Sequence, residues 1–272
     1  MTVRGKGWFR DPYDSRDKDA EGVLFAHSAT AAPAPRDVNL YGLVVAEPRL
    51  EEVEDQGSTS ACVGFGFKQD LQLGLYLATR AYVEPDPLFI YKNALTAVGG
   101  KYQDVGCYPR LAAVGLRSWG AVESKGAFDP STVHDPIPWH QLQQGAAARV
   151  NNFYKVFGTG AALVENLRRA LAAKKPFTFG QEVDRAFNDY KGGVLGKFRG
   201  ASYGGHMTMC YGYDASGNFL CKNQWGSWGE LGGALRRQRG YYRMSPERMM
   251  ERHVTDHYAF DPALGGTPQV TK

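Results

Sequence analysis

The stretch VEDQGSTSACVGFGF, residues 53–67, places a cysteine where a polar, turn-forming run gives way to an apolar one. From Cys62 to about Arg80, apolar residues recur at steps of three and four, which predicts a helix. A second apolar stripe in the same segment indicates that this helix is buried on most of its sides. Glycines inside it would weaken a helix, so they indicate close packing around it. The Cys62 thiol is therefore either a small core residue or the nucleophile of an enzyme.

The composition excludes several classes of protein. With 272 residues and 43% hydrophobic content, the chain can bury a sizeable core in one large domain or in two lobes. No run approaches the roughly 18 apolar residues of a membrane span, and the N-terminus lacks the apolar core of a signal peptide. The net charge of +4 is interspersed along the chain without a basic stripe. We therefore expect a cytoplasmic protein with no membrane or nucleic-acid partner.

Four cysteines, at 62, 107, 210 and 221, are too few for a disulfide scaffold in a chain of this length, so we expect reduced thiols. Cys210 and Cys221 lie on the two arms of one predicted hairpin. They are either a bridge or two buried free thiols, and the lack of other disulfide signals favours free thiols. His253 and His257 have a spacing found in metal sites. No third ligand lies close by, so we expect no metal and no other cofactor.

The order of the predicted elements indicates an α+β fold in two lobes. After the first helix, two more helices are expected around residues 87–98 and 108–119, followed by a loop-rich middle at 120–152. The remainder is a helix at 162–175, a strand at 176–183, a strand–turn–strand unit at 206–226, a strand at 240–244 and a short helix at 246–252. Helices come first and strands later, without regular alternation, which is typical of α+β proteins.

The chain divides into three parts on its composition. Residues 1–47 are rich in Asp, Pro, Ala and Arg, with the linker-like TAAPAPRD at 30–37. We expect them to form an extended segment that packs on the main domain, residues 48–260. Within that domain, the helical lobe is expected at about 48–125 and the β lobe at about 126–260. Residues 261–272 are expected to be a flexible tail.

A cysteine nucleophile requires a favoured thiolate, a base within reach, and donors for the oxyanion formed on attack. Cys62 lies where a helix begins, so free N–H groups and the helix dipole favour a negative sulfur and predict a lowered pKa. The backbone N–H of Cys62 is one candidate oxyanion donor. The side-chain NH2 of Gln56, on the approaching loop, is the second candidate.

The other half of this constellation lies in the predicted strands. His206, in YGGHMTMCYGY, is the candidate base, and Gly204 and Gly205 before it leave space for a substrate backbone. Asn223, in CKNQWGSWGE, could orient one imidazole nitrogen so that the other faces the thiol. Trp225 could shield that hydrogen bond from water. Each residue alone has an ordinary structural explanation, and only the ordered set indicates catalysis.

Three motifs, QGSTSAC, GGH…YGYD and KNQWGSWGELG, together resemble the papain-like cysteine peptidases of the C1 family. The order Gln, Cys, His, Asn is kept, and the resemblance extends from about Pro48 to Met244. RGKGWFRDPYDSRD, at 4–17, is similar to the lead-in of compact bacterial members that lack a long prodomain. The resemblance implies a two-lobed fold in which a helical lobe with a buried central helix faces an antiparallel β lobe, with the active site in the cleft between them.

The resemblance also implies residue roles. Cys62 would be the nucleophile, His206 its proton partner and Asn223 the residue that orients the imidazole. Gln56 would be the oxyanion donor, and Trp225 would pack over the His–Asn contact. YQDVGC, at 102–107, looks like the D-x-G loop of the family, in which Gly106 would hydrogen-bond an extended substrate backbone. The implied protein is a monomeric cysteine endopeptidase that acts on peptides or proteins through a thioester acyl-enzyme.

The chain departs from the family pattern at several positions. Thr59 replaces a cysteine that forms a disulfide in secreted members, which fits a reducing compartment. Ser60 and Val63 also differ from the usual residues, and Gln224 stands where serine is common. Two alternatives remain open: a different acyl transfer at the same site, such as amide cleavage or transamidation, and an inactive binding protein. Side-chain preference, endo- against exopeptidase action, and gating by the first 47 residues are also left open.

Overall fold

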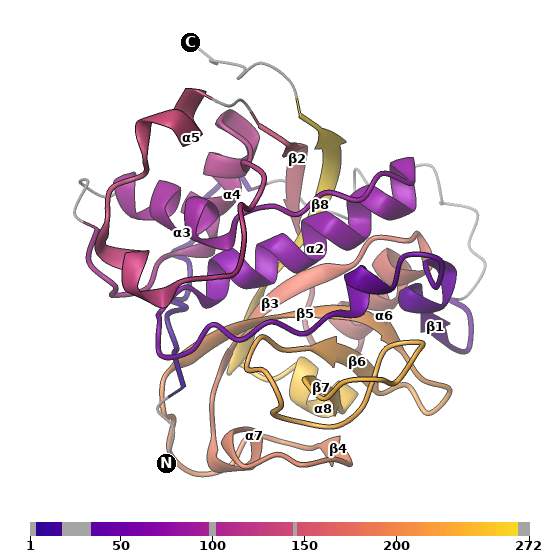
Figure 1. Cartoon of the computed structure of the whole chain (residues 1–272). Helices are drawn as coiled ribbons and strands as arrows, with labels where there is room; N and C mark the ends of the chain where they lie inside the picture. Colours follow the sequence, from indigo (N-terminus) through magenta and orange to yellow (C-terminus); the bar gives the residue numbers. More distant parts are fainter. Residues whose placement is uncertain (1–3, 18–33, 98–101, 144–145, 266–272) are drawn as a thin grey trace.

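In the computed structural model, residues 4–17, 34–97, 102–143 and 146–265 are described. Helix α2 (Cys62–Thr79) runs through the middle of the molecule, with the other helices of its lobe on one side and the sheet on the other (Figure 1). Every residue of α2 from Cys62 to Leu75 is buried. A Cβ atom on Gly64 would overlap the carbonyl of Pro87, so this glycine allows the next helix to approach closely. The predicted buried central helix is confirmed.

The helical side consists of α3 (Pro87–Thr96), α4 (Pro109–Ser118), the 3-10 helix η3 (Pro130–His134) and α5 (Trp139–Gln143). Helices α3 and α4 both begin with proline at a position where no backbone N–H is needed. The Asp86 side chain caps α3 by accepting from two backbone N–H groups of its first turn. These helices confirm the predictions around 87–98 and 108–119.

The strands of the described residues form one sheet in the order β2-β8-β3-β5-β6-β7-β4, and β1 also pairs with β5. All neighbours are antiparallel except β4 and β7. The strands are β1 (Val38–Asn39), β2 (Ala148–Lys155), β3 (Phe177–Glu182), β4 (Val194–Leu195), β5 (Gly205–Tyr213), β6 (Phe219–Lys222), β7 (Tyr241–Met244) and β8 (Val254–Leu264). The remaining helices are η1 (Leu40–Leu43), η2 (Pro48–Glu51), α6 (Gly160–Ala172), α7 (Arg185–Asn188) and α8 (Pro246–Met249). The predicted α+β class is confirmed.

Strands β1, β2, β4 and β8 were not predicted, and β2 and β8 are the long ones among them. β2 begins inside the stretch 120–152 that was expected to be loop, and it pairs with β8. β8 continues to Leu264, into the expected flexible tail at 261–272. β2 pairs with β8, and β8 also pairs with β3. Pairing between segments so distant in sequence leaves little local signal. The rest of that tail, 266–272, and residues 30–33 of the predicted linker lie outside the described residues.

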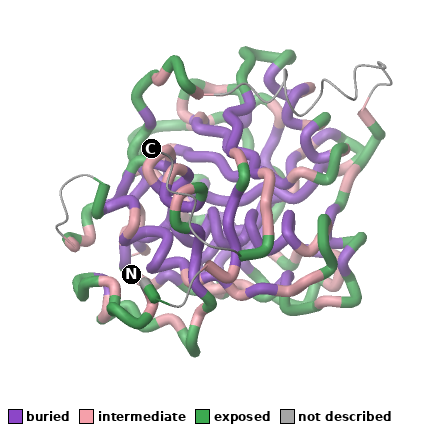
Figure 2. Tube along the Cα trace, turned by 90° about the horizontal axis from the view of Figure 1, so that it is seen from above, coloured by how far each residue is buried: buried purple, intermediate pink, exposed green. Residues whose placement is uncertain are grey.

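The first 47 residues divide into two described parts. In the second part, Leu40 and Tyr41 are buried in the core and β1 pairs with β5, so this part belongs to the sheet rather than only lying on it. The first part, residues 4–17, is the N-terminal strap. In Figure 1 it is the indigo segment beside the start of α2. Figure 2 shows buried backbone running through the centre of the molecule with exposed loops around it. No helix of the described part is long and apolar enough to cross a membrane.

Candidate active site

Cys62 is the first residue of α2 and has no exposed surface. Burial raises the pKa of its thiol to about 11, although backbone N–H groups of Met207, Gly7 and Val63 hydrogen-bond the sulfur and act in the opposite direction. The lowered pKa expected from the helix start is therefore wrong for this structure. The reason is that the sulfur is buried without exposed surface, and this burial disfavours the thiolate more than the N–H groups favour it.

His206 and Asn223 form a buried pair. The imidazole Nε2–H donates to Asn223 Oδ1 at 2.7 Å, and the same oxygen accepts from the backbone N–H of Gln224 at 2.8 Å. The Trp225 ring stacks on the imidazole with centroids 4.3 Å apart. Burial lowers the pKa of His206 to about 3, and the nearby cations Lys6 and Arg4 lower it further. The imidazole is therefore neutral, and its buried Nδ1 has no hydrogen-bond partner among the described residues.

Gln224 connects the two halves of the site. Its side-chain Nε2 donates to the carbonyl of Met207 at 2.7 Å and to the carbonyl of Cys62 at 3.3 Å. The backbone carbonyl of Gln224 accepts from the backbone N–H of Gln56 at 3.0 Å. One amide side chain thus ties the start of α2 to the strand that carries His206. The sequence assigned no role to Gln224, and its only signal was a polar residue directly after Asn223.

Gln56 is fully buried beside the strap. Its Nε2 donates to the carbonyl of Thr59 at 2.7 Å, within its own loop, and its Oε1 has no described partner. The backbone N–H of Gly5 donates to the carbonyl of Gly57 at 2.9 Å. A Cβ atom on Gly5 would lie 2.9 Å from Gln56 Nε2. The candidate oxyanion donor is therefore covered by the strap.

The strap passes between the loop at 102–107 and the start of β5. The backbone N–H of Cys107 donates to the carbonyl of Gly7 at 2.8 Å, and the N–H of Phe9 donates to the carbonyl of Cys107 at 3.2 Å. On the other side, the N–H of Trp8 donates to the carbonyl of Gly205 at 3.2 Å. The strap thus lies as an extended chain between the two segments that were expected to hold a substrate backbone.

Each predicted substrate-binding glycine faces a residue of the strap. A Cβ atom added to the glycine would overlap or touch the strap in every case, at Gly106 against Gly7, at Gly204 against Lys6 and at Gly205 against Trp8. The backbone N–H of Gly106 donates to the hydroxyl of Tyr91 at 2.8 Å. The fourth such residue, Trp225, donates its indole N–H to the carbonyl of Gly5 at 3.3 Å. The structure therefore brings all four together around the strap.

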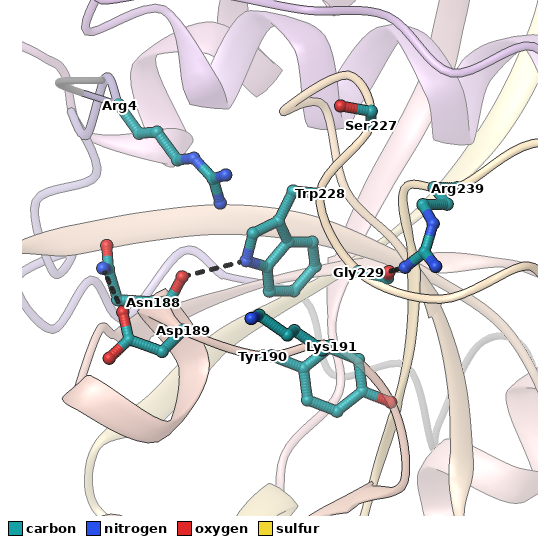
Figure 3. A pocket seen from close by; sticks show the side chains of 9 residues that line it. All are labelled: Arg4, Asn188, Asp189, Tyr190, Lys191, Ser227, Trp228, Gly229 and Arg239. Atoms are coloured by element: carbon teal, nitrogen blue, oxygen red, sulfur yellow. Dashed lines mark hydrogen bonds between the residues drawn. The ribbon is translucent and has the colours of Figure 1, made fainter. Parts of the chain in front are cut away.

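A cavity of about 930 Å³ lies beside Trp228. Its lining residues, drawn in Figure 3, are Arg4, Asn188, Asp189, Tyr190, Lys191, Ser227, Trp228, Gly229 and Arg239. The indole N–H of Trp228 donates to the carbonyl of Asn188 at 3.1 Å, and its ring centroid is 5.6 Å from that of Trp225. Figure 3 shows the Arg4 side chain reaching from the strap toward Trp228. The strap thus contributes one wall of this space.

The cysteines and histidines that were considered for a disulfide or a metal site lie apart from this site. Cys210 and Cys221 face each other across β5 and β6 as free thiols, as expected. His253 lies 3.1 Å from Glu182, and the buried His257 stacks against Phe179. No group of three His, Cys, Asp or Glu side chains in the described part of the chain is placed to hold a metal ion.

Comparison with known sequences gives two matches. A sequence profile described as "Papain family cysteine protease" matches residues 120–255, the half of the chain that contains His206 and Asn223. The chain is also 33% identical over 194 residues to the "Gamete and mating-type specific protein A" of Dictyostelium discoideum. That alignment covers 66% of this chain and 39% of the relative, so the chain spans about two fifths of the relative's length.

Solved structures are similar over most of the chain. Xylellain, a cysteine protease from Xylella fastidiosa, has a TM-score of 0.69 at 20% identity, covering 96% of this chain and 97% of that one. The proCathepsin B S9 from Trypanosoma congolense has a TM-score of 0.71 at 17% identity, covering 95% and 86%. The bromelain protease from Ananas comosus, solved with the E64 inhibitor, has a TM-score of 0.60 at 18% identity, covering 85% and 99%. At these identities the likeness shows the fold, and it confirms the predicted two-lobed architecture.

Proposed function

Because the chain belongs to the papain family of cysteine proteases, we propose that it hydrolyses peptide bonds in peptide or protein substrates with Cys62 as the nucleophile. One observation carries the proposal. His206 is held by Asn223 at 2.7 Å through Nε2, while its Nδ1 is buried without a described partner. The residue after His206, Met207, gives its backbone N–H to the Cys62 sulfur. The imidazole of His206 therefore lies near the thiol, and its Nδ1 has no hydrogen-bond partner among the described residues.

The reaction begins with a proton transfer. The free Nδ1 of His206 takes the proton of the Cys62 thiol, and Asn223 keeps the imidazolium oriented through Nε2–H. The thiolate then attacks the scissile carbonyl, forming the S–C bond and placing the electron pair of the C=O bond on oxygen. The Cys62 N–H and a side-chain N–H of Gln56 stabilise this oxyanion, and a single such donor is typically worth about 3–4 kcal/mol.

Two further transfers complete the cycle. His206 gives its proton to the leaving amine as the C–N bond breaks, which leaves a thioester on Cys62. In the second half, His206 takes a proton from water, the hydroxide attacks the thioester, and the acid is released as the thiolate leaves. Gln224 is a positioning residue in this scheme, because its amide fixes the Cys62 carbonyl relative to the strand of His206.

We further propose that this structure is a closed form of the enzyme. A substrate backbone and the N-terminal strap would occupy the same space, since Gly7 touches the sulfur and Gly5 covers Gln56. The thiol with its raised pKa and the neutral imidazole are the protonation states that suit a resting site without water. Residues 4–11 must therefore move before a peptide reaches Cys62.

The test is chemical labelling combined with turnover. The purified chain is incubated with a thiol-directed epoxide, the modified cysteine is mapped by mass spectrometry, and cleavage of a peptide library is followed in parallel. We expect the label on Cys62, and we expect Cys62→Ala to abolish both labelling and cleavage, while Cys221→Ala retains both. A label elsewhere in folded protein, or cleavage by Cys62→Ala, would contradict the proposal. Addition of an amine nucleophile, followed by product analysis, separates hydrolysis from transamidation.

A further inference from the structure

Two buried thiols face each other on neighbouring strands of the sheet. Cys210 on β5 and Cys221 on β6 are directly opposite in the antiparallel ladder, and the two strands run side by side (Figure 1). Residues opposite each other in such a ladder project from the same face, and their Cα atoms lie about 4.5 or 5.5 Å apart. A disulfide needs Cα atoms about 4.4–6.8 Å apart. The register of the two strands therefore matches the spacing that a disulfide requires.

The two thiols also interact with each other. Cys221 hydrogen-bonds the thiol of Cys210, whose own Sγ donates to the carbonyl of Gly212 at 3.4 Å. Both cysteine side chains are fully buried. Burial raises the pKa of the Cys221 thiol, and the contact with Cys210 raises that pKa further. Buried, protonated thiols are poor nucleophiles, so we expect the folded protein to keep this pair reduced even beside an oxidant.

The hairpin that joins the two cysteines is closed by contacts within itself. Asp214 Oδ1 accepts from the backbone N–H groups of Ser216 and Asn218, each at 2.9 Å. Gly217 has a φ of +84°, a conformation that glycine adopts at little cost. The two cysteines are also closer in sequence than any other two of the four. Closure of a short loop costs the least entropy, so oxidation during folding favours this pair over the others.

The same hairpin leads to the candidate catalytic residues. His206 lies four positions before Cys210 on β5, and Asn223 lies two positions after Cys221 on β6. Even spacings keep side chains on one face of a strand. On this face, His206 Nε2–H donates to Asn223 Oδ1 at 2.7 Å. A bond between the two cysteines would therefore tie the strand of His206 to the strand that leads to Asn223.

We propose that Cys210 and Cys221 are an oxidative modification site, at which a chain that folds beside a low-molecular-weight disulfide acquires a cross-strand disulfide. The step is thiol–disulfide exchange. One thiolate of the unfolded chain attacks glutathione disulfide, which forms a mixed disulfide and releases one glutathione thiolate. The second thiolate attacks the chain's sulfur in that mixed disulfide, which forms the Cys210–Cys221 bond and releases the other glutathione. The chain loses two electrons, glutathione disulfide gains them, and the two thiol protons end on the released glutathiones.

The compartment in which the chain folds therefore decides the state of the pair. In a reducing compartment the thiols stay free and become buried. In an oxidising compartment the bond forms first, and the sheet then covers it. This inference concerns the hairpin alone and does not depend on the proposed peptidase function.

The test refolds Cys62→Ala from urea with either glutathione disulfide or dithiothreitol. This variant avoids self-cleavage and removes the Cys62 thiol from the exchange. Trypsin then releases the peptide 200–222, which contains both cysteines of the pair and no other. After oxidative refolding, we expect this peptide to take up no alkylating reagent and to be lighter by two hydrogen atoms. Folded, reduced protein incubated with glutathione disulfide should remain fully alkylatable once it is denatured.

Two results of this mapping would overturn the proposal. Complete alkylation of the peptide after oxidative refolding would show that the bond does not form. Oxidation of the folded protein as fast as of the refolding chain would show that folding does not decide the state of the pair.

The bond should also stabilise the fold, because it constrains the unfolded chain. A loop of this length predicts an unfolding equilibrium constant about 100-fold smaller for the oxidised protein, measured by urea denaturation with and without dithiothreitol. Cys221→Ala in the same background should lose this difference. Cys107→Ala, which removes a buried thiol outside the pair, should keep it. A difference that survives in Cys221→Ala, or an oxidised form less stable than the reduced one, would overturn the proposal.

Turnover of the wild type tests whether the bond fits the native hairpin. After oxidative refolding, reduced glutathione frees Cys62 while the buried bond is retained. We expect kcat/KM to equal that of the reduced protein, because the bond joins strands that are already paired. Loss of turnover with the bond intact would overturn the fit. The denaturation measurements use an inactive chain, so they decide the proposal even if the wild type cleaves no peptide, a result that would overturn only the peptidase function.

Discussion

Replacement of Trp8 by alanine should open the cleft without unfolding the protein. The Trp8 indole is the largest apolar group that the strap buries near Cys62, and it donates one hydrogen bond to Asp256. Its ring lies against two glycines of the sheet, at the edge of the apolar core around α2 to which it belongs. The variant keeps the backbone bonds of the strap to Cys107 and Gly205. It therefore weakens closure rather than abolishing it.

The magnitude follows from the contacts. A buried tryptophan removes roughly 150–250 Å² from water, which at about 25 cal/mol per Å² corresponds to about 4–6 kcal/mol. The bond to the Asp256 carboxylate adds about 1.5–3 kcal/mol. Freeing the ring returns side-chain entropy, and Asp256 regains water, so the net change is smaller than the sum. We expect the free energy of closure to fall by about 3–4 kcal/mol, which increases the open population by a factor of about 100–1,000.

The assay is alkylation of Cys62 by iodoacetamide under native conditions, followed over time by peptide mapping. We expect Trp8→Ala to react about 100-fold faster than the wild type or more. Trp139→Ala is the matched control, because that ring is 71% exposed, and its rate should stay within about twofold of the wild type. Cys210, buried in the sheet, reports on global unfolding and should stay unlabelled. A Cys62 rate in Trp8→Ala equal to that of the wild type would refute closure by the strap.

Three further outcomes are expected. Gln56→Ala should lower kcat by about 100-fold with little change in melting temperature, and an unchanged rate would exclude Gln56 as an oxyanion donor. His206, whose pKa is about 3 in the fold and about 6.5 when unfolded, stabilises the fold above pH 6.5 and loses that contribution as the pH falls toward 3. Urea denaturation should therefore show the wild type losing about 2 kcal/mol more than His206→Gln between pH 6.5 and 5, and equal losses would contradict burial of the neutral ring. Gln224→Ala removes two hydrogen bonds to buried carbonyls and should cost about 1–3 kcal/mol of stability, whereas the exposed Gln103→Ala should cost less than about 0.5 kcal/mol.

The central helix and the ordered set around Cys62 and His206 could be predicted from the sequence. The helix follows from local periodicity, and the candidate site residues lie in short motifs whose order along the chain carries the signal. The structure brings Cys62, His206, Asn223 and Gln56 together around the start of α2. Their chemical roles remain predictions.

What could not be predicted depends on contacts between distant segments. β2 pairs with β8, and β8 also pairs with β3, and neither β2 nor β8 carries clear alternation. The pKa of Cys62 was expected to be low, but it is raised because the folded chain buries the sulfur, and this burial outweighs the backbone N–H groups that favour the thiolate. Trp8 and Asp256 carry no motif. Gly180, inside an otherwise good strand, was the one readable hint that another group approaches the sheet there.

The strap is part of the same polypeptide as the cleft. In the proposed closed form it therefore competes with substrate for the cleft as a tethered ligand. A tethered ligand has an effective concentration set by the length of its linker, in the millimolar range for short flexible linkers, so dilution of the protein does not release it. A substrate that competes with it meets a higher apparent KM and an unchanged kcat. If the proposed closed form holds, Michaelis constants measured for this chain contain the equilibrium constant of closure, and cutting the chain between Trp8 and the rest of the molecule removes that contribution.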